Sequence, residues 1–258
     1  GPKLFQLYIH KDKSLTDNLI DRCKRSGFNA MCLTVDTVVA GNRERDHRWG
    51  FTTPPKLTLK SLLSFALHPR WSINYLTHKK FELANVSHFT KKGSSIAKGV
   101  MEYINEQYDP GMGWKDAEYC IKKWDGPFAI KGIMSVEDAK RAVQIGASAI
   151  MLSNHGGRQL DGSRAPFDQL PAIADAIGGK AEIILDGGIR RGTHVLKALS
   201  LGATACSFGK GYLFGLGAGG QKGVEAVLQR MHDEIKRDMI LMGCKSIKEL
   251  NKSNILYR

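Results

Sequence analysis

A short pattern recurs three times along the chain: a stretch with helical spacing ends at a glycine, and an unbroken apolar run follows within a few residues. The glycines are Gly27, Gly146 and Gly202, and the apolar runs span 31–35, 150–152 and 206–208. Glycine suits the left-handed backbone at the end of a helix. Short continuous apolar runs that follow helices are typical of a parallel α/β sheet. The pattern therefore predicts helices and parallel strands in alternation.

Further apolar runs predict strands at 5–8, 128–131 and 183–185, and helices are expected at 14–26, 135–145, 192–200 and 220–242. The resulting six βα units are spaced as such repeats require, except between the second and third strands, which lie about 95 residues apart. We therefore expect a single domain over 1–258 that carries an insertion at 41–109.

The insertion is basic and aromatic. Residues 42–92 hold ten Lys and Arg against three acidic residues, about half of the chain's net charge of +13. Trp49, Phe65, Trp71 and Tyr75 lie in the insertion, and leucines from Leu59 onward form one helical face before Pro69. Two interpretations stay open: a segment that lies on a membrane surface, or a cover over the sheet with a solvated basic rim. Nucleic-acid binding rests on the charge alone, because no recognition motif accompanies it, and no nucleic-acid partner is expected.

The sequence excludes several other classes. No apolar run approaches the roughly 18 residues that a membrane-spanning helix needs. The five cysteines are widely spaced, without a CxxC pair or a Cys/His cluster, so neither a disulfide framework nor a metal site is expected. A reducing intracellular compartment follows from that cysteine usage.

Polar residues follow almost every predicted strand. Because the carboxyl ends of parallel strands meet at one edge of the sheet, we expect one composite site there. Its candidates, in chain order, are Gln6 and Tyr8, Thr34 and Asp36, Lys131, the segment 153–158, the segment 186–192, and Gly209 with Lys210.

The last two strand ends indicate a phosphate site. Gly187 and Gly188 allow a close approach of the backbone to an anion, and the helix start that follows offers free N–H groups. Arg190 and Lys210 supply positive charge. The alternative is a tight turn beside a surface lysine.

His155 is the candidate base, since a neutral imidazole accepts a proton near pH 7. Asp36 could orient the ring and stabilise its protonated form. Arg158 could hold a carboxylate with two parallel hydrogen bonds, and Lys131 could place positive charge beside a developing anion.

The nine residues 153–161, Ser-Asn-His-Gly-Gly-Arg-Gln-Leu-Asp, closely resemble the signature of FMN-dependent α-hydroxy-acid dehydrogenases and oxidases. The motifs at 5–8, 33–37, 130–132 and 186–192 agree and fall in the same order. The resemblance implies a (β/α)8 TIM barrel of the FMN-linked oxidoreductase type, of which this chain, beginning at what resembles the third strand, lacks the first two βα units. It also implies oxidation of an L-2-hydroxy acid to the 2-oxo acid, with L-lactate as the first expectation and mandelate and glycolate behind it.

The resemblance assigns roles residue by residue. His155 is the base and Asp36 its partner, while Tyr8, Arg43 and Arg158 contact the substrate. The flavin is contacted by Gln6, Thr34, Lys131, Ser153 and Asp186, and its phosphate by Gly187, Gly188, Arg190, Gly209 and Lys210. Lys210 departs from the family, which has arginine there. Lysine keeps the charge and loses the two-pronged geometry.

Partners follow from the same resemblance. A membrane quinone or a cytochrome is expected to accept the electrons, and an oxidase that uses oxygen is the alternative. The segments 67–71, 114–116 and 124–127 resemble the membrane-associated members, which implies a peripheral protein on the cytoplasmic side of the inner membrane, with a soluble cytoplasmic protein as the alternative. A homotetramer is implied as well. A truncated, non-catalytic barrel remains a second hypothesis.

Overall fold

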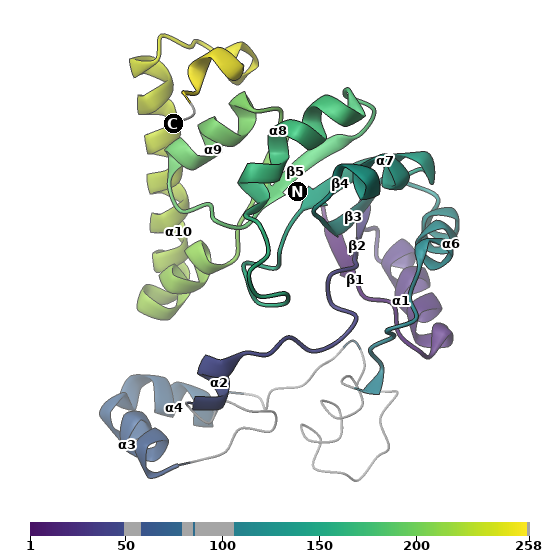
Figure 1. Cartoon of the computed structure of the whole chain (residues 1–258). Helices are drawn as coiled ribbons and strands as arrows, with labels where there is room; N and C mark the ends of the chain where they lie inside the picture. The colour runs from purple at the N-terminus through teal and green to yellow at the C-terminus, as the bar shows by residue number, and fades with distance from the viewer. Residues whose placement is uncertain (49–57, 79–84, 86–105, 257–258) are drawn as a thin grey trace.

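Six parallel strands form one sheet in the computed structural model, which describes residues 1–48, 58–78, 85 and 106–256 (Figure 1). The strands pair in sequence order, with β1 and β6 at the two edges. They are β1 (Leu4–Leu7), β2 (Ala30–Thr34), β3 (Phe128–Ile133), β4 (Ala149–Leu152), β5 (Glu182–Asp186) and β6 (Ala205–Ser207). All six strands expected from the apolar runs are confirmed.

Helices connect the strands and cover one side of the sheet (Figure 1). They are α1 (Lys13–Arg25), α6 (Trp114–Trp124), α7 (Val136–Gln144), α8 (Pro166–Ile177), α9 (Gly192–Ser200) and α10 (Lys210–Leu241), followed by the short 3-10 turns η2 (Ile247–Glu249) and η3 (Lys252–Asn254). The helix expected at 220–242 is the second part of α10. Gly219 and Gly220 leave the helical conformation and separate it from an earlier part that the sequence did not indicate.

The two faces of the sheet differ because successive side chains of a strand point to opposite sides. Leu33, Ile130, Leu152 and Leu185 belong to the large core beneath the helices. Residues of the other parity, Cys32, Ala129 and Met151, form a small separate cluster on the opposite face. That face also carries the polar ends of the strands, so the strand periodicity itself gathers the candidate site on one side.

Three helices of the insertion lie away from the sheet (Figure 1). They are α2 (Glu44–Arg48), α3 (Leu59–Leu67) and α4 (Pro69–Thr77), with Thr58 capping α3 and Pro69 opening α4. The leucine face predicted before Pro69 is confirmed as a helix face, but its side chains are exposed, with Leu59 at 87% and Leu67 at 70%. Within the described residues these helices therefore do not cover the sheet. Trp49 lies outside the described residues, as do 79–84 and 86–105.

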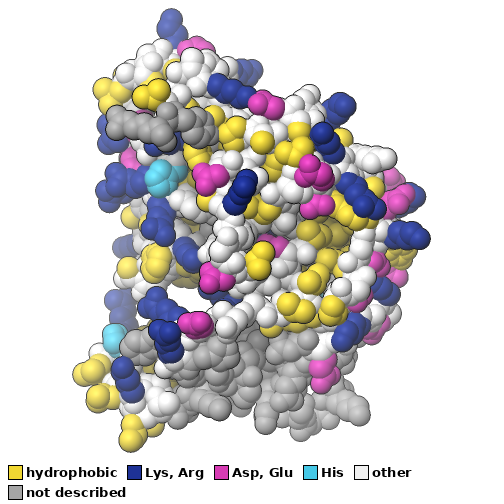
Figure 2. All heavy atoms as spheres, in the orientation of Figure 1, with side chains coloured by type: hydrophobic (Ala, Val, Ile, Leu, Met, Phe, Trp, Pro, Cys, Tyr) yellow, Lys and Arg dark blue, Asp and Glu magenta, His cyan; other side chains and the backbone are white. Residues whose placement is uncertain are grey.

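The exposed side chains of α3 and α4 gather at one end of the molecule (Figure 2). Phe65, Trp71 and Tyr75 stack in a row, with successive ring centroids 5.3 Å apart. We call these two helices with their exposed apolar residues the α3–α4 patch. Of the helices that the structure describes, none has both the length and the apolar character needed to cross a membrane.

Candidate active site at the carboxyl ends of the strands

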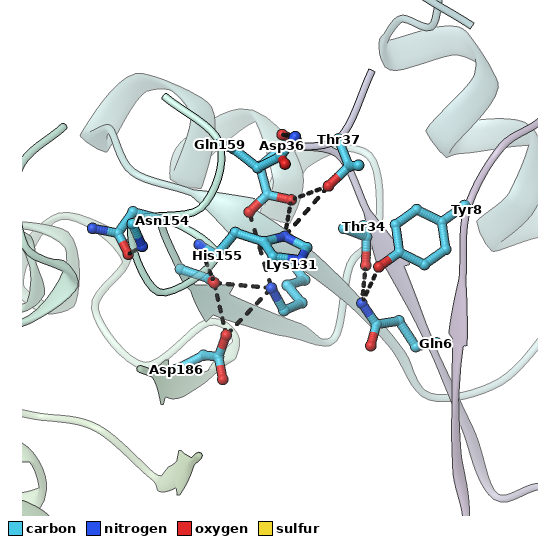
Figure 3. A network of polar contacts seen from close by, with 12 residues as sticks. Gln6, Tyr8, Thr34, Asp36, Thr37, Lys131, Asn154, His155, Gln159 and Asp186 are labelled. Atoms are coloured by element: carbon cyan, nitrogen blue, oxygen red, sulfur yellow. Dashed lines mark hydrogen bonds and ion pairs between the residues drawn. The ribbon is translucent and has the colours of Figure 1, made fainter. Parts of the chain in front are cut away.

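A lysine, a serine hydroxyl and an aspartate carboxylate from three neighbouring strand ends form the centre of the site (Figure 3). Lys131 Nζ on β3 donates to Ser153 Oγ at 2.9 Å and lies 3.2 Å from Asp186 Oδ2. Ser153 Oγ in turn donates to Asp186 Oδ2 at 2.7 Å, and Ser153 is fully buried. An ammonium group has three donors. Ser153 and Asp186 take two of these donors, and the only other described partner of Lys131, Asp36 Oδ2 at 3.9 Å, is beyond hydrogen-bond distance, so one hydrogen can serve a bound group.

A histidine–aspartate pair lies beside this lysine. His155 Nδ1 is 3.0 Å from Asp36 Oδ1, and Thr37 Oγ1 donates to the same oxygen at 3.0 Å. Lys131 Nζ lies 3.9 Å from the other carboxyl oxygen of Asp36. Burial by itself would raise the pKa of the Asp36 carboxyl, but the His155 hydrogen bond and the Lys131 charge outweigh it and hold that pKa below its ordinary value. Asp36 is therefore ionised at neutral pH and fixes His155 with Nδ1 as the donor.

The backbone around this pair has little freedom to change. His155 itself has a positive φ of 59°, and Gly156 and Gly157 continue the left-handed turn. From this turn after β4, the His155 ring reaches Asp36, which follows β2. On the other side, Gly132 (φ 105°) approaches Asp36 so closely that an added Cβ would lie 2.8 Å from Asp36 Cβ. Only glycine allows this approach.

A second polar group lies at the ends of β1 and β2 (Figure 3). Gln6 Nε2 donates to Thr34 Oγ1 at 2.7 Å and to the Tyr8 hydroxyl at 2.9 Å. Both hydrogens of the amide nitrogen are thereby used, and the Gln6 carbonyl oxygen stays available as an acceptor. Burial, followed by the negative charge of Asp36, raises the pKa of Tyr8, which therefore keeps its proton.

The glycine-rich ends of β5 and β6 are open. An added Cβ at Gly188 or Gly209 would meet nothing within 4 Å, and Arg190 is exposed. Lys210 Nζ reaches across to donate to the Gly156 carbonyl at 3.2 Å, which brings the ends of β4 and β6 together.

The sequence predicts that the helix after β5 begins with free N–H groups, and this prediction is wrong for the first of them. The first N–H of α9, on Gly192, donates to Glu234 Oε2 at 2.8 Å, and Arg191 Nη2 lies 2.8 Å from the other oxygen of Glu234. Glu234 reaches this position from α10, more than forty residues later in the chain. An anion at this edge would therefore be held by the loop 187–190 and by Lys210 rather than by that N–H group.

The two candidate arginines are not brought into contact with the rest of the site. Arg43 and Arg158 are both exposed, and their side chains make no hydrogen bond or ion pair with the described residues. Their loops do touch: Gly41 lies so close to the Arg158 carbonyl oxygen that a Cβ on residue 41 would overlap it. Two guanidinium groups are thus carried on adjoining loops, and no described residue uses their donors.

Three participants were not singled out from the sequence. Thr37 and Gln159 lie inside the motifs at 33–37 and 153–161, and those motifs are the signal that marks them. Gln159 donates to the backbone carbonyls of Asp36 and Val39. Glu234 carried no local signal, because its role depends on how α10 packs against α9.

Metal-ligand groupings of His, Cys, Asp and Glu do not occur among the described residues, and all five cysteines are free thiols. A cavity of about 870 Å³ lies behind the His155 loop, between the loops that follow β3 and β4. Asp36, Gly132 and Gln159 form part of its wall.

The family model of FMN-dependent dehydrogenases matches residues 1–257. The chain belongs to this family. It is 43% identical over 249 residues to an L-lactate oxidase of Nostoc sp., covering 96% of this chain and 62% of that protein. It is 39% identical over 258 residues to an L-lactate dehydrogenase of Vibrio cholerae, covering the whole chain and 68% of that protein. The chain thus spans about two-thirds of the length of the curated relatives it matches.

Solved structures agree with the sequence relatives. The monotopic membrane protein (S)-mandelate dehydrogenase superposes with a TM-score of 0.94 at 33% identity, over the whole chain and 68% of that structure. A flavocytochrome b2 with bound pyruvate superposes with a TM-score of 0.74 at 33% identity, over 98% of the chain and 53% of that structure. The expected fold class, six βα units of an FMN-dependent α/β barrel, is confirmed, and so is FMN as the cofactor of the family.

Proposed function

We propose that this protein uses FMN to oxidise an L-2-hydroxy acid, with L-lactate as the first substrate, to the corresponding 2-oxo acid. The observation that carries the proposal is the His155–Asp36 pair, held at 3.0 Å beside Lys131 at the ends of β2, β3 and β4. Similarity to an L-lactate oxidase and to L-lactate dehydrogenases supports the substrate class.

The residues present fit a flavin mononucleotide. Lys131 has one free hydrogen and Gln6 a free carbonyl oxygen, which suit the polar edge of a flavin ring. Thr34, Ser153 and Asp186 lie along the same face of the sheet, where the sugar-like chain would run. The open loops at Gly187, Gly188 and Gly209, together with Arg190 and Lys210, suit the phosphate.

His155 acts as the base in this proposal. Its Nδ1 hydrogen is held by Asp36, so Nε2 carries the free lone pair and accepts a proton from the substrate. Asp36 then stabilises the imidazolium that forms, as an aspartate does in a catalytic triad. When bound, FMN supplies the acceptor for the two electrons that leave the substrate.

The remaining groups bind and orient the substrate. Arg43 and Arg158 hold its carboxylate, whose two oxygens match the planar pair of donors on a guanidinium group. Tyr8, which keeps its proton, donates a hydrogen bond to the substrate. Lys131 places positive charge beside the bound cofactor, where it stabilises a developing negative charge.

Anaerobic mixing tests this function. The flavin-loaded protein is expected to lose its yellow absorbance with L-lactate, more slowly with mandelate or glycolate. His155→Gln should retain the yellow colour and fail to bleach, whereas the exposed His232→Gln should bleach as the wild type does. A colourless protein that cannot be reconstituted with FMN would refute the proposal and favour a non-catalytic barrel.

The electron acceptor is proposed to be a quinone or a cytochrome. The superposition with flavocytochrome b2 and the identity to L-lactate dehydrogenases support it. Lactate-dependent reduction of a soluble quinone analogue should exceed oxygen consumption by the same sample. Oxygen consumption at the faster rate would establish the oxidase alternative.

We propose that the α3–α4 patch lies on a membrane surface. We further propose a peripheral protein on the cytoplasmic side of the inner membrane, with a soluble cytoplasmic protein as the alternative. Its stacked rings and exposed leucines suit the boundary between headgroups and acyl chains, and the basic insertion suits anionic lipids. Trp71→Ser should reduce co-sedimentation with anionic vesicles, and Tyr212→Ser on α10 should not.

A homotetramer is proposed as well, and light scattering of the purified protein tests it.

A further inference from the structure

Gln159 joins the two loops that carry the proposed acid–base pair (Figure 3). Its amide nitrogen donates to the Asp36 carbonyl at 3.1 Å and to the Val39 carbonyl at 3.0 Å. Both hydrogens of that nitrogen are therefore spent on the loop after β2. The backbone of Gln159 belongs to the other loop, four residues beyond His155.

The fit around Gln159 is close. A Cβ on Gly41 would lie 2.6 Å from Gln159 Oε1 and 3.1 Å from its Cα, so the β2 loop wraps directly over this side chain. Gln159 Oε1 is buried and accepts no hydrogen bond. A buried unpartnered carbonyl is unfavourable. The Gln159 side chain thus keeps the orientation in which its nitrogen donates to both carbonyls of the loop after β2, although its own oxygen has no hydrogen-bond partner.

Asp36 is consequently fixed from three directions. Gly132 contacts it on the β3 side, Thr37 donates to its carboxyl, and Gln159 holds its backbone carbonyl. Of these, the contact with Gln159 is the one that ties Asp36 to the loop of His155. The same side chain ties Val39, and through it the chain that leads to Arg43, to the loop that carries Arg158.

We infer that Gln159 is a positioning residue, which sets the Asp36–His155 distance by holding the loop after β2 against the loop after β4. This inference rests on the proposed function for its effect on turnover, and on the geometry alone for its effect on the pair. A positioned acid–base pair is sensitive to small displacements, since a misplacement of about 1 Å can slow a reaction about 100-fold.

Gln159→Glu tests this inference, because it changes the hydrogen-bonding groups of the side chain and leaves its shape almost unchanged. An ionised carboxylate cannot donate, and it would face two carbonyl oxygens, so the β2 loop should be released at high pH. Burial and the two facing carbonyl oxygens disfavour the charged form, so the pKa of the introduced carboxyl should lie well above its ordinary value of about 4.3. A protonated carboxyl can donate to one of the two carbonyls, so lowering the pH to 6 should restore part of the contact. Other charged groups line the adjacent cavity, namely Asp36, Glu137 and Arg164, and His155 is bonded to Asp36. Each variant is therefore compared with the wild type at the same pH.

Two matched controls separate hydrogen bonding from other effects. Gln144→Glu makes the same chemical change at an exposed position of α7. Gln159→Leu removes both hydrogen bonds at every pH. We expect flavin reduction by L-lactate in Gln159→Glu to be slowed about 10- to 100-fold at pH 9 and much less at pH 6. Gln159→Leu should be slowed equally at both pH values and Gln144→Glu at neither, with FMN affinity within twofold of the wild type in all three.

The second measurement needs no turnover. In the flavin-loaded protein with ¹⁵N-labelled histidine, the His155 Nδ1 proton bonded to Asp36 should give a downfield resonance. In Gln159→Glu that resonance should disappear by exchange with water at pH 9 and return at pH 6. A resonance that persists unchanged at pH 9 would overturn the inference, whatever the turnover shows. Failure of the wild type to reduce FMN would instead count against the proposed function, while this resonance would still report on Gln159.

Discussion

Gly132→Ala perturbs the position of Asp36 without touching a polar group. A methyl group at residue 132 would lie 2.8 Å from Asp36 Cβ and 2.9 Å from its backbone nitrogen, whereas ordinary contact begins at 3.4 Å. Asp36 must therefore retreat by about 0.6 Å to restore ordinary contact, and the cavity whose wall both residues form leaves room for that movement. The His155–Asp36 bond of 3.0 Å would be stretched toward or beyond the usual hydrogen-bond limit of about 3.2 Å.

The free energy of unfolding should fall for two reasons. A side chain at φ 105° is strained by about 1–3 kcal/mol, and the overlap with Asp36 adds about 1–3 kcal/mol. Together these lower the melting temperature by roughly 5–20 °C in a chain of this length. Flavin reduction by L-lactate should slow by at least about 10-fold, because the acid–base pair is displaced.

Gly178→Ala is the matched control. Gly178 also has a positive φ, 54°, but an added Cβ there would meet nothing within 4 Å. It should lower stability by only about 1–2 kcal/mol and leave flavin reduction unchanged. Thermal unfolding followed by circular dichroism and anaerobic stopped-flow absorbance measure both quantities. If Gly132→Ala behaves like Gly178→Ala in both assays, the close approach to Asp36 does not constrain the site.

Three further predictions concern the cofactor, the pH dependence and the thiols. Lys210→Arg should tighten FMN binding about 10-fold, because guanidinium donates to phosphate in parallel pairs; weaker binding in a fluorescence titration would contradict this. Since the pKa of Asp36 is lowered in the fold, against the effect of its burial, the stability it contributes is present at neutral pH and lost as the pH falls below about 4. Urea midpoints of wild type and Asp36→Asn should therefore differ at pH 7 and approach each other as the pH is lowered below about 4, and a constant difference would exclude this role. Burial raises the pKa of Cys32 to about 12, so iodoacetamide at pH 8 should modify it only after unfolding, while the partly exposed Cys244 reacts first in the folded protein; mass spectrometry decides.

The arrangement of the site was predictable where it depends on the strand ends. Thr34, Lys131 and Asp186 each end or nearly end an apolar run, and side chains two residues apart share a face of a strand. Parallel pairing then aligns Thr34 with Lys131 across neighbouring strands. The pairing of His155 with Asp36 was a reasonable hypothesis from the same geometry, and the structure places the two 3.0 Å apart.

Contacts between distant segments were not predictable. Glu234 satisfies the start of α9 from the far part of α10, and no local pattern marks it as a helix cap. The apolar face of α3 was recognised, but whether it packs on the sheet or faces outward depends on what lies beside it. The sequence left both interpretations open, and the structure exposes that face.

The sequence by itself determined the order of the elements, the family and the identity of the polar groups at the strand ends. These depend on local periodicity, glycine placement and short motifs, all of which are written along the chain. Only the tertiary structure decided three contacts. Gln159 joins the His155 loop to the Asp36 loop, Gly132 lies against Asp36 where no larger residue would fit, and Lys210 donates to the Gly156 carbonyl. Each of these joins residues that are distant in the chain, and their separation is fixed by how strands and helices pack rather than by any local preference.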